Sequence, residues 1–315
     1  MNSTTEQLAH AVLLPAVADI DSSVLAPLIE RGCRSVLLGE TRDEYLARTM
    51  SERRASHETR EVVTSAIAGL RALTPDRLLV VVDHEVVGIR RFEHLIPDPA
   101  TAGTELASLG IDVVLGPIVD VVRGPNPWLE GRNLGTDSAT VAAVARAEVE
   151  ALQSAGVAAV AKHYPGHAVT RNDPAVDLGN VPTELTELDT IDEEPFAAVV
   201  GAGVRGLMLG PAVIDAIDPE ETASCSPVVA ARARRRLGFQ GTLVSDDLDA
   251  VSILRGRKVG EVAVKSLSAG LDLLLVPASV APECAAAIVE AVDDGRLPLD
   301  RLTEAAAQVE ALGEP

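Results

Sequence analysis

Eight short apolar runs recur along the sequence, and stretches with the pattern of amphipathic helices separate them. The runs are continuous rather than alternating, which is typical of parallel strands that are buried on both faces. They occupy residues 12–16, 35–39, 78–83, 112–117, 157–162, 206–211, 241–246 and 271–277. This alternation predicts an α/β fold, a single-domain (β/α)₈ TIM-type barrel over residues 1–315. A doubly wound open sheet is the alternative, but no glycine-rich phosphate loop follows the first run.

Helical patterns between the runs have recognisable ends. Among them are residues 58–73, 137–156, 188–203 and 226–238. Asp137 and Ser226 stand at positions that favour N-caps. Glycines at 156, 203 and 270 are in keeping with C-terminal caps. The dense basic run RARRR at 232–236 is predicted to be the solvated end of a helix.

Charge and cysteine content restrict the class of protein. A formal net charge of −20 argues against nucleic acid as a partner, because phosphate binding needs clustered basic residues. Cys33, Cys225 and Cys284 form no C-x-x-C pair, which predicts reduced thiols rather than disulfides or a zinc site. The first residues lack the pattern of a secretory signal, and no apolar run approaches the roughly 20 residues of a membrane helix. The sequence therefore predicts a soluble, cytoplasmic protein without a membrane partner.

Polar residues follow four of the predicted strands, where barrel enzymes carry their chemistry. They are Asp83, His84 and Glu85 after the third run, Asp120 after the fourth, Lys162 and His163 at the fifth, and Asp246 and Asp247 at the seventh. Taken alone, Asp246 or Asp247 could simply cap a helix that begins at Asp249. Repetition across four strand ends instead favours a functional site that is rich in carboxylates.

The loop GPNPWLEGRNLGTD, residues 124–137, adds two candidates. Arg132 could form a surface salt bridge, or it could donate in a fork to a polyhydroxylated or anionic ligand. Trp128, the sole tryptophan, could stack on a sugar face or could simply be packed. Three glycines and two prolines indicate that this loop has a defined shape.

Several ordered motifs resemble glycoside hydrolase family 3. They are LLVVVDHE with IRRF, LGPIVDVV followed by NPWLEGRNLGTD, VAKHYPGH, DEEPF, LGFQGTLVSDDLDA and AGLDLLLVP, and they run from about residue 10 to residue 312. The KHYPGH element resembles the β-N-acetylglucosaminidase (β-N-acetylhexosaminidase) branch of that family. The resemblance implies a barrel that hydrolyses glycosides with no metal and no organic cofactor.

The resemblance also implies roles for individual residues. Asp246, in SDDL, stands at the position of the nucleophile. The positions that hold the hydroxyl groups of the terminal sugar are Asp83, Arg91, Arg132, Lys162 and His163. A retaining glycosidase needs one carboxylate to attack the anomeric carbon and a second group to protonate the departing oxygen.

The sequence departs from the family at the proton donor. In this branch the donor is a histidine paired with an aspartate two residues earlier, and alignment on KHYPGH places Asp173 on the aspartate and Ala175 on the histidine. Val86-Val87-Gly88 replaces the usual Gly-Gly-Arg, and Pro211 stands where a histidine often follows the sixth strand. A substitute acid could be Asp173 first, or Asp177 or His167.

We therefore expect a retaining β-glycosidase that acts on an N-acetylglucosaminide or a related small-molecule amino-sugar glycoside, with a non-standard or missing acid. One alternative is a catalytically silent protein that binds sugars. Another is a barrel recruited to a different step, such as that of a phosphorylase or a lyase, for instance with phosphate as the nucleophile. A substrate whose leaving group is acidic enough to depart unaided would also explain Ala175.

Overall fold

The eight apolar runs form eight parallel strands of one sheet, as predicted. The computed structural model describes residues 3–20 and 22–314. Its strands are β1 Leu13–Val17, β2 Ser35–Leu38, β3 Leu79–Val82, β4 Val113–Val114, β5 Ala158–Tyr164, β7 Gly206–Leu209, β10 Thr242–Ser245 and β11 Leu274–Pro277. They follow the order β10-β7-β5-β4-β3-β2-β1-β11. A parallel bridge between Val244 and Leu273 joins the two ends of the sheet, so that the strands close into the predicted barrel.

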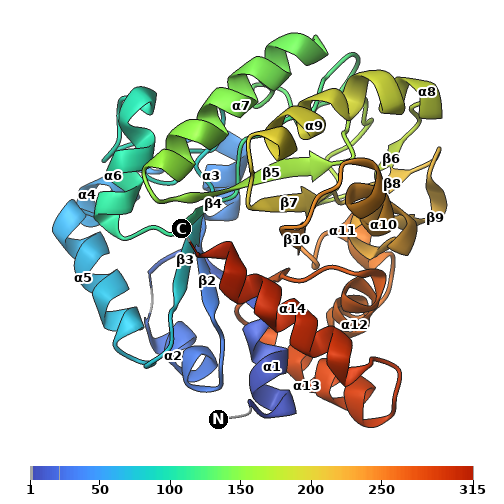
Figure 1. Ribbon diagram of the computed structural model, residues 1–315. Helices are drawn as coiled ribbons and strands as arrows, with labels where there is room; N and C mark the ends of the chain where they lie inside the picture. The colour runs from blue at the N-terminus through green and yellow to red at the C-terminus, as the bar shows by residue number, and fades with distance from the viewer. Residues whose placement is uncertain (1–2, 21, 315) are drawn as a thin grey trace.

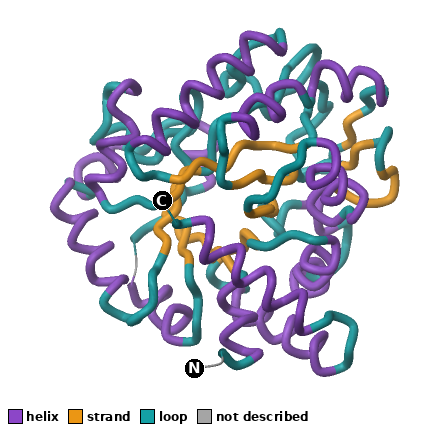
Figure 2. Tube along the Cα trace, in the orientation of Figure 1, coloured by secondary structure: helices purple, strands orange, loops and turns teal. Residues whose placement is uncertain are grey.

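Helices surround the strands (Figures 1 and 2). They are α1 Thr5–Ala11, α2 Ser22–Glu30, α3 Arg42–Ala47, α4 Glu52–His57, α5 Arg60–Arg71, α6 Ala102–Leu109, α7 Ser138–Ser154, α8 Leu185–Glu187, α9 Glu194–Gly201, α10 Pro227–Arg236, α11 Val251–Leu254, α12 Val259–Ala269, α13 Ala281–Asp293 and α14 Leu299–Leu312. The predicted N-caps are confirmed, because the side chains of Asp137 and Ser226 accept from the backbone N–H groups of Thr140 and Val229. Gly270 ends α12 in the left-handed conformation, with φ 109°.

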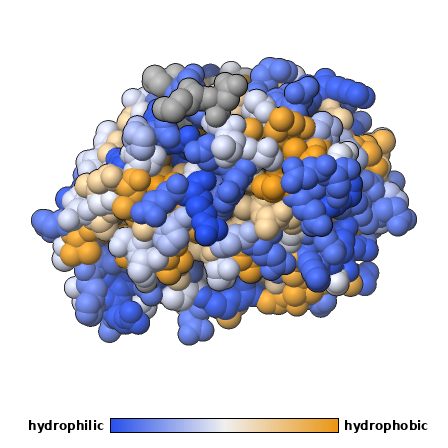
Figure 3. Space-filling model, turned by 90° about the horizontal axis from the view of Figure 1, so that it is seen from below, coloured by the Kyte–Doolittle hydropathy of each residue, from blue (hydrophilic) through white to orange (hydrophobic). Residues whose placement is uncertain are grey.

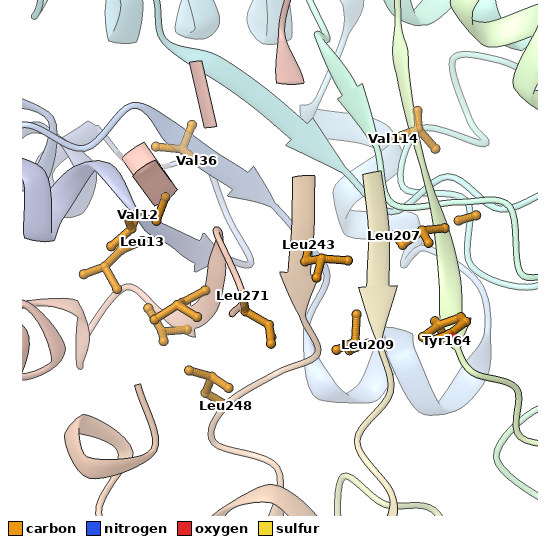
Figure 4. Close-up of a cluster of buried hydrophobic side chains, with 14 of the residues drawn as sticks. Val12, Leu13, Val36, Val114, Tyr164, Leu207, Leu209, Leu243, Leu248 and Leu271 are labelled. Carbon is orange, nitrogen blue, oxygen red and sulfur yellow. The ribbon is translucent and has the colours of Figure 1, made fainter. Parts of the chain in front are cut away.

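Two packing layers hold the barrel, and alternation along each strand assigns side chains to them. In β3, Leu79 and Val81 belong to the interior cluster, whereas Val80 and Val82 join the cluster between strands and helices. Figure 4 shows Leu207, Leu209 and Leu243 among the buried side chains of this outer cluster. The end of α14 contributes Val309 and Leu312 to the interior cluster. This helix therefore closes one end of the barrel, and its last turn lies close to β2 and β3 (Figure 1).

Some local predictions were incomplete. The pattern at 188–203 divides into a π-helix, η2 at Leu188–Asp192, and α9. A second sheet of three short strands, β6 Asn180–Val181, β8 Val213–Ile214 and β9 Asp218–Thr222, was not predicted. Because two of these strands have only two residues, they carry too little alternation to be recognised. The sheet links the segment that follows β5 to the segment that follows β7.

The basic run at the end of α10 is not simply solvated, which corrects the prediction. Arg232 and Arg236 pair with the Glu193 carboxylate, at 2.7 and 2.6 Å, and Arg234 pairs with Asp272 at 2.9 Å. Of the four arginines, only Arg235 is exposed and forms no ion pair within the described part of the chain. The run is thus an attachment of α10 to its neighbours, because arginines can bury their stems while the head groups find carboxylates.

On the face shown in Figure 3, hydrophobic residues are scattered among hydrophilic ones. Within residues 3–20 and 22–314, no helix has both the length and the apolar character needed to cross a bilayer.

Candidate active site

A cup opens at the carboxyl ends of the strands and encloses about 590 Å³ of empty space. Its polar lining consists of Glu40, Arg42, Tyr45, Asp83, Trp128, Arg132, Lys162, His163, Asp246 and Asp247. These residues lie far apart in the sequence, and the barrel brings them together because parallel strands end on the same face. Asp83, Arg132, Lys162, His163, Asp246 and Trp128, all predicted site residues, meet here.

The floor of the cup is a network of four charged residues, Asp83, Glu85, Arg132 and Lys162. Lys162 Nζ contacts Asp83 Oδ1 and lies 3.1 Å from Glu85 Oε1. Arg132 donates to both Glu85 oxygens, at 2.6 and 3.1 Å. Burial opposes ionisation of Glu85, but Arg132 and Lys162 overcome it and lower the pKa of that carboxyl to about 2. The floor therefore keeps its charges at neutral pH.

The charged network of the floor leaves no room for a side chain at position 88. Gly88 has φ 95°, and a Cβ placed there would lie 2.6 Å from Glu85 Oε2 and 2.7 Å from Arg132 Cγ. A side chain at this position would therefore displace the Arg132–Glu85 pair. Gly88 therefore fits the space that the Arg132–Glu85 pair leaves at this position.

His163 is held on one wall of the cup by Asp120. The Asp120 carboxylate accepts from the His163 backbone N–H at 3.0 Å and from Nδ1 at 2.8 Å. Burial lowers the pKa of His163, against the opposing effect of Asp120, so the ring is neutral and carries its hydrogen on Nδ1. Nε2 then presents a lone pair, 3.9 Å from Asp246 Oδ2. The register between β5 and β7 shifts between Lys162 and Tyr164, which lets both Lys162 and His163 reach the cup.

Asp246 has one oxygen fixed and one available. Its Oδ1 accepts from the Asp247 backbone N–H at 2.8 Å, and its backbone N–H donates to Ser224 Oγ at 3.1 Å. Oδ2 is buried and has no hydrogen-bond partner among residues 3–20 and 22–314. The next helix, α11, begins after Ala250 without a side-chain cap, so the alternative reading of Asp246 and Asp247 as helix caps is wrong.

The rim of the cup consists of Tyr45, Trp128, Asp173 and Ala175. Trp128 Nε1 donates to the Tyr45 hydroxyl at 3.1 Å, and that hydroxyl donates to Asp173 Oδ2 at 3.4 Å. Asp173 Oδ1 accepts from the Ala175 backbone N–H at 2.9 Å. Ala175 lines the cup, whereas Asp173 is outside the lining. The position of the expected proton donor therefore faces the cup with a methyl group.

The structure places three of the predicted site residues outside the lining of the cup. Arg91 is fully buried and donates to both oxygens of Glu58, at 2.6 and 2.9 Å, and to the Gly39 carbonyl at 2.5 Å. It is absent from the lining of the cup, and its bond to Gly39 supports the segment before Glu40. His167 is also outside the lining, because it is buried against the Trp128 ring, with centroids 5.3 Å apart. Asp177 is exposed and accepts from Asn172 and from the Leu178 backbone.

His84 faces away from the cup. It lines a second cavity together with Glu148 of α7, and this cavity has about 940 Å³ of empty space. Burial, followed by the charge of Arg90, lowers the pKa of His84 to about 4, so its ring is neutral. His84 therefore does not join the groups that meet at the floor, although it lies between Asp83 and Glu85 in the sequence.

Sequence reasoning missed Glu40, and it named Asp247 only as a strand-end carboxylate. Glu40 lines the cup, and burial together with the charge of Asp83 raises the pKa of its carboxyl to about 8. Burial within the cup, and then the charges of Asp246 and Asp249, raise the pKa of Asp247, although solvent in the cup reaches this residue. Glu40 follows the second apolar run directly, so the strand-end rule that selected Asp83 could also have found it.

The arrangement suits a polyhydroxylated ligand better than a metal. Among residues 3–20 and 22–314, no three His, Cys, Asp or Glu side chains form a group that could hold a metal ion. Charged donors and acceptors alternate around the cup, and a carboxylate oxygen without a partner lies beside them. Such groups can orient hydroxyls by charge-assisted hydrogen bonds and can present a nucleophile.

Comparison with known proteins gives a consistent result. Residues 99–312 match the sequence model of the glycosyl hydrolase family 3 N terminal domain. A beta-hexosaminidase of Xanthomonas oryzae pv. oryzae is 31% identical over 265 residues, which cover 76% of this chain and 78% of that protein.

Solved structures share the fold. A glycoside hydrolase family 3 beta-N-acetylglucosaminidase from Paenibacillus sp. str. FPU-7 superposes with a TM-score of 0.88 and 26% identity, covering 99% of this chain and 62% of that chain. M tuberculosis LpqI superposes with a TM-score of 0.85 and 26% identity, covering 100% of this chain and 94% of the other. The chain thus spans less than two thirds of the Paenibacillus protein but nearly all of LpqI.

Proposed function

Because this chain belongs to glycosyl hydrolase family 3, we propose that it is a retaining β-glycosidase that cleaves N-acetylglucosaminides or related amino-sugar glycosides. Asp246 is the nucleophile in this proposal, and residues 1–315 act as one barrel domain. The relatives named beta-hexosaminidase and beta-N-acetylglucosaminidase support the substrate class. The observation that carries the mechanism is the buried Asp246 Oδ2, which lines the cup without a hydrogen-bond partner in the described chain.

The floor would fix the terminal sugar. Arg132 Nη1 is buried without a partner in the described residues and can donate to a sugar oxygen. Asp83 and Lys162 offer an acceptor and a donor for neighbouring hydroxyls, and the lone pair of His163 Nε2 accepts from another. Because these side chains are already held by ion pairs, little conformational freedom is lost when the sugar binds.

Reaction then proceeds in two displacements. Asp246 Oδ2 forms a bond to the anomeric carbon while the bond to the aglycone oxygen breaks, which gives a covalent glycosyl-enzyme and an aglycone that departs as its anion. Water attacks the same carbon in the second step, loses a proton to solvent, releases the Asp246 carboxylate and restores the original configuration. Asp246 is well placed for this role because Oδ1 stays hydrogen bonded to the Asp247 backbone while Oδ2 reacts.

The first displacement lacks the usual proton donor. A positioned general acid accelerates such steps by about 10²–10⁴-fold, and Ala175 cannot supply a proton. Asp173 is the acid nearest in sequence to that position, yet both of its oxygens accept hydrogen bonds and it does not line the cup. We therefore propose that the favoured substrates have acidic leaving groups, with Asp173 as the first candidate for a substitute donor.

Aryl β-N-acetylglucosaminides with leaving groups of graded acidity test this mechanism. We expect an adduct on Asp246, detected by mass spectrometry, with dinitrophenyl glycosides, and a steep fall in rate as the phenol becomes less acidic. A shallow dependence that Asp173→Ala makes steep would identify Asp173 as the donor. Turnover that survives Asp246→Ala would overturn the mechanism.

A silent sugar-binding protein is the second candidate, because Ala175 removes the usual donor. It predicts sugar binding with no adduct under any condition. A phosphorylase would instead transfer the sugar to phosphate, which product analysis in phosphate buffer would detect. A lyase would release an unsaturated sugar with its own absorbance.

A further inference from the structure

Three buried polar atoms that lack partners among residues 3–20 and 22–314 belong to residues that line the cup. They are Glu40 Oε2, Arg132 Nη1 and Asp246 Oδ2. A buried polar atom without a partner is costly, so each of these three indicates a group that a ligand supplies. The proposed chemistry uses Asp246, and a sugar hydroxyl oxygen satisfies Arg132. Glu40 is left without a function.

Carboxyl groups outnumber cations around Glu40. Asp83 and Glu85 face it from the segment after β3, Lys162 from β5, Arg132 from the loop after β4, and Asp247 from the segment after β10. The two cations among them are already engaged, because Lys162 and Arg132 pair with Asp83 and Glu85.

Arg42 also lines the cup, but it stacks on the Tyr45 ring at 5.0 Å and forms no ion pair with Glu40. The carboxyl groups that line or underlie the cup therefore outnumber its cations, and this crowding contributes to the raised pKa of Glu40 and of Asp247. The carboxyl groups belong to Glu40, Asp83, Glu85, Asp246 and Asp247, and the cations are Arg42, Arg132 and Lys162.

We propose that Glu40 binds a free amino group on the sugar, so that the cup selects glycosides of unacetylated amino sugars over their N-acetylated counterparts. This inference rests on the proposed function, and it names the substrate class within it. An ammonium group donates hydrogen bonds to Glu40 Oε2, and its positive charge favours the ionised form of a carboxyl group that other carboxyl groups crowd. An N-acetyl group can donate one hydrogen bond, but it brings no charge.

Glu40 is assigned to the sugar rather than to the leaving group because of its neighbours. Its strongest electrostatic neighbours are Asp83, Lys162, Glu85 and Arg132, which form the floor. The proton donor of a retaining glycosidase instead has to face the bond beside the nucleophile. Glu40 is therefore a binding residue that determines specificity.

Protonation gives this inference a distinctive pH dependence. Burial and Asp83 raise the pKa of the free Glu40 carboxyl to about 8, and a bound ammonium requires this group to be ionised. The ratio of kcat/KM for an amino glycoside to that for the matched neutral glycoside should rise as Glu40 ionises and fall again at the pH where the ammonium group of the substrate loses its proton. Taking the ratio removes the titration of groups that act on both substrates.

The experiment uses 2,4-dinitrophenyl β-glucosaminide, β-N-acetylglucosaminide and β-glucoside, whose leaving group needs no proton donor. We expect the wild-type protein to prefer the glucosaminide. Glu40→Gln should lower kcat/KM for the glucosaminide by about 30-fold or more, because it removes one member of a buried charge pair. The other two substrates should change by less than about 3-fold, and the rise of the ratio with pH should disappear.

Glu148→Gln is the matched control. Glu148 has a buried oxygen without a partner in the described chain and a pKa raised to about 8, but it lines the second cavity rather than the cup. It should leave the preference for the glucosaminide unchanged. Equal losses on all three substrates in Glu40→Gln, or a wild-type preference for the N-acetylated substrate, would overturn the inference.

Calorimetric titration with glucosamine and N-acetylglucosamine separates this inference from the proposed function. In one outcome, no substrate labels Asp246, yet glucosamine binds more tightly than N-acetylglucosamine and Glu40→Gln removes that difference in affinity. The proposed glycosidase activity is then wrong, whereas the proposed site for the amino group is supported. If Asp246 is labelled but the protein binds glucosamine no better than N-acetylglucosamine, the glycosidase stands and this inference fails. Absence of glucosamine binding also overturns it.

Discussion

The floor and the rim of the cup differ in how their polar groups are held. Each charged residue of the floor is paired with another of the same network, and Glu85 and Lys162 are almost completely buried. At the rim, the Asp173 carboxylate is half-buried and accepts only a tyrosine hydroxyl at 3.4 Å and one backbone N–H. The floor lies at strand ends and in contact with them, whereas Asp173 and Ala175 lie on the long segment between β5 and β6.

This difference explains how residues of the rim can be replaced while those of the floor are kept. A substitution at the floor leaves a buried charge without its partner, so it affects folding as well as binding. A substitution at the rim affects mainly chemistry, because loops tolerate change at little cost in stability. Replacement of the expected histidine by Ala175 therefore need not disturb the groups that would hold the sugar.

The largest expected effect is on folding. Glu85→Gln leaves Arg132 and Lys162 with a neutral partner, and it should lower the free energy of unfolding by about 3–5 kcal/mol, as for other broken buried pairs. Asp173→Asn at the rim should lower it by about 1 kcal/mol or less. Urea denaturation of the two variants measures both values. Similar losses in the two would remove the contrast between floor and rim.

The next effect is on chemistry at the rim. Ala175→His places an imidazole two residues after Asp173, and it should accelerate cleavage of glycosides with poor leaving groups by about 10²-fold. Dinitrophenyl glycosides should react at the unchanged rate, because their departure needs no proton. Ala175→Gln controls for side-chain size, and steady-state kinetics on both substrate types gives the comparison. An unchanged rate in a folded Ala175→His protein would mean that more than one side chain is missing.

A smaller effect should appear in the pH dependence of stability. Glu40 borders the floor but shares none of its ion pairs, and its pKa is raised to about 8. Between the pKa of about 4.3 in the unfolded chain and this value, only the unfolded chain releases the proton, so rising pH destabilises the fold. Glu40→Gln should therefore be more stable than wild type by about 1–2 kcal/mol at pH 8, and by much less near pH 4.5. Urea denaturation at both pH values decides, and an equal difference at both would contradict the prediction.

The smallest effect is expected at Asp177, which is exposed on the segment between β5 and β6. Asp177→Ala should change the free energy of unfolding by no more than about 0.5 kcal/mol and leave turnover as it was. A loss of activity in this variant would show that the segment folds onto the cup when substrate binds.

The sequence predicted the barrel because its signal is repeated. Eight continuous apolar runs can each be misjudged by a few residues without changing the fold, and every one overlaps a strand. The small sheet of β6, β8 and β9 was missed because strands of two residues carry no period. The strand-end rule likewise placed Asp83, Lys162, His163 and Asp246 near one another, as the cup shows.

The tertiary structure decided which of these neighbours are available to a ligand. Arg91 and Arg132 both lie in segments rich in turns. Glu58 and the Gly39 carbonyl accept hydrogen bonds from Arg91, whereas Arg132 keeps Nη1 without a partner in the described chain. Glu40 and Glu85 carry the same carboxyl group. Two neighbouring cations lower the pKa of Glu85, whereas burial and the charge of Asp83 raise the pKa of Glu40.

By itself, then, the sequence determined the barrel, the face that carries the site, and the absence of an ionisable group at position 175. These depend on local periodicity and residue identity, which a linear chain displays directly. Only the tertiary structure decided the pairing, burial and protonation of each polar group. These properties depend on distances between residues that are far apart in the sequence, and no local pattern encodes them.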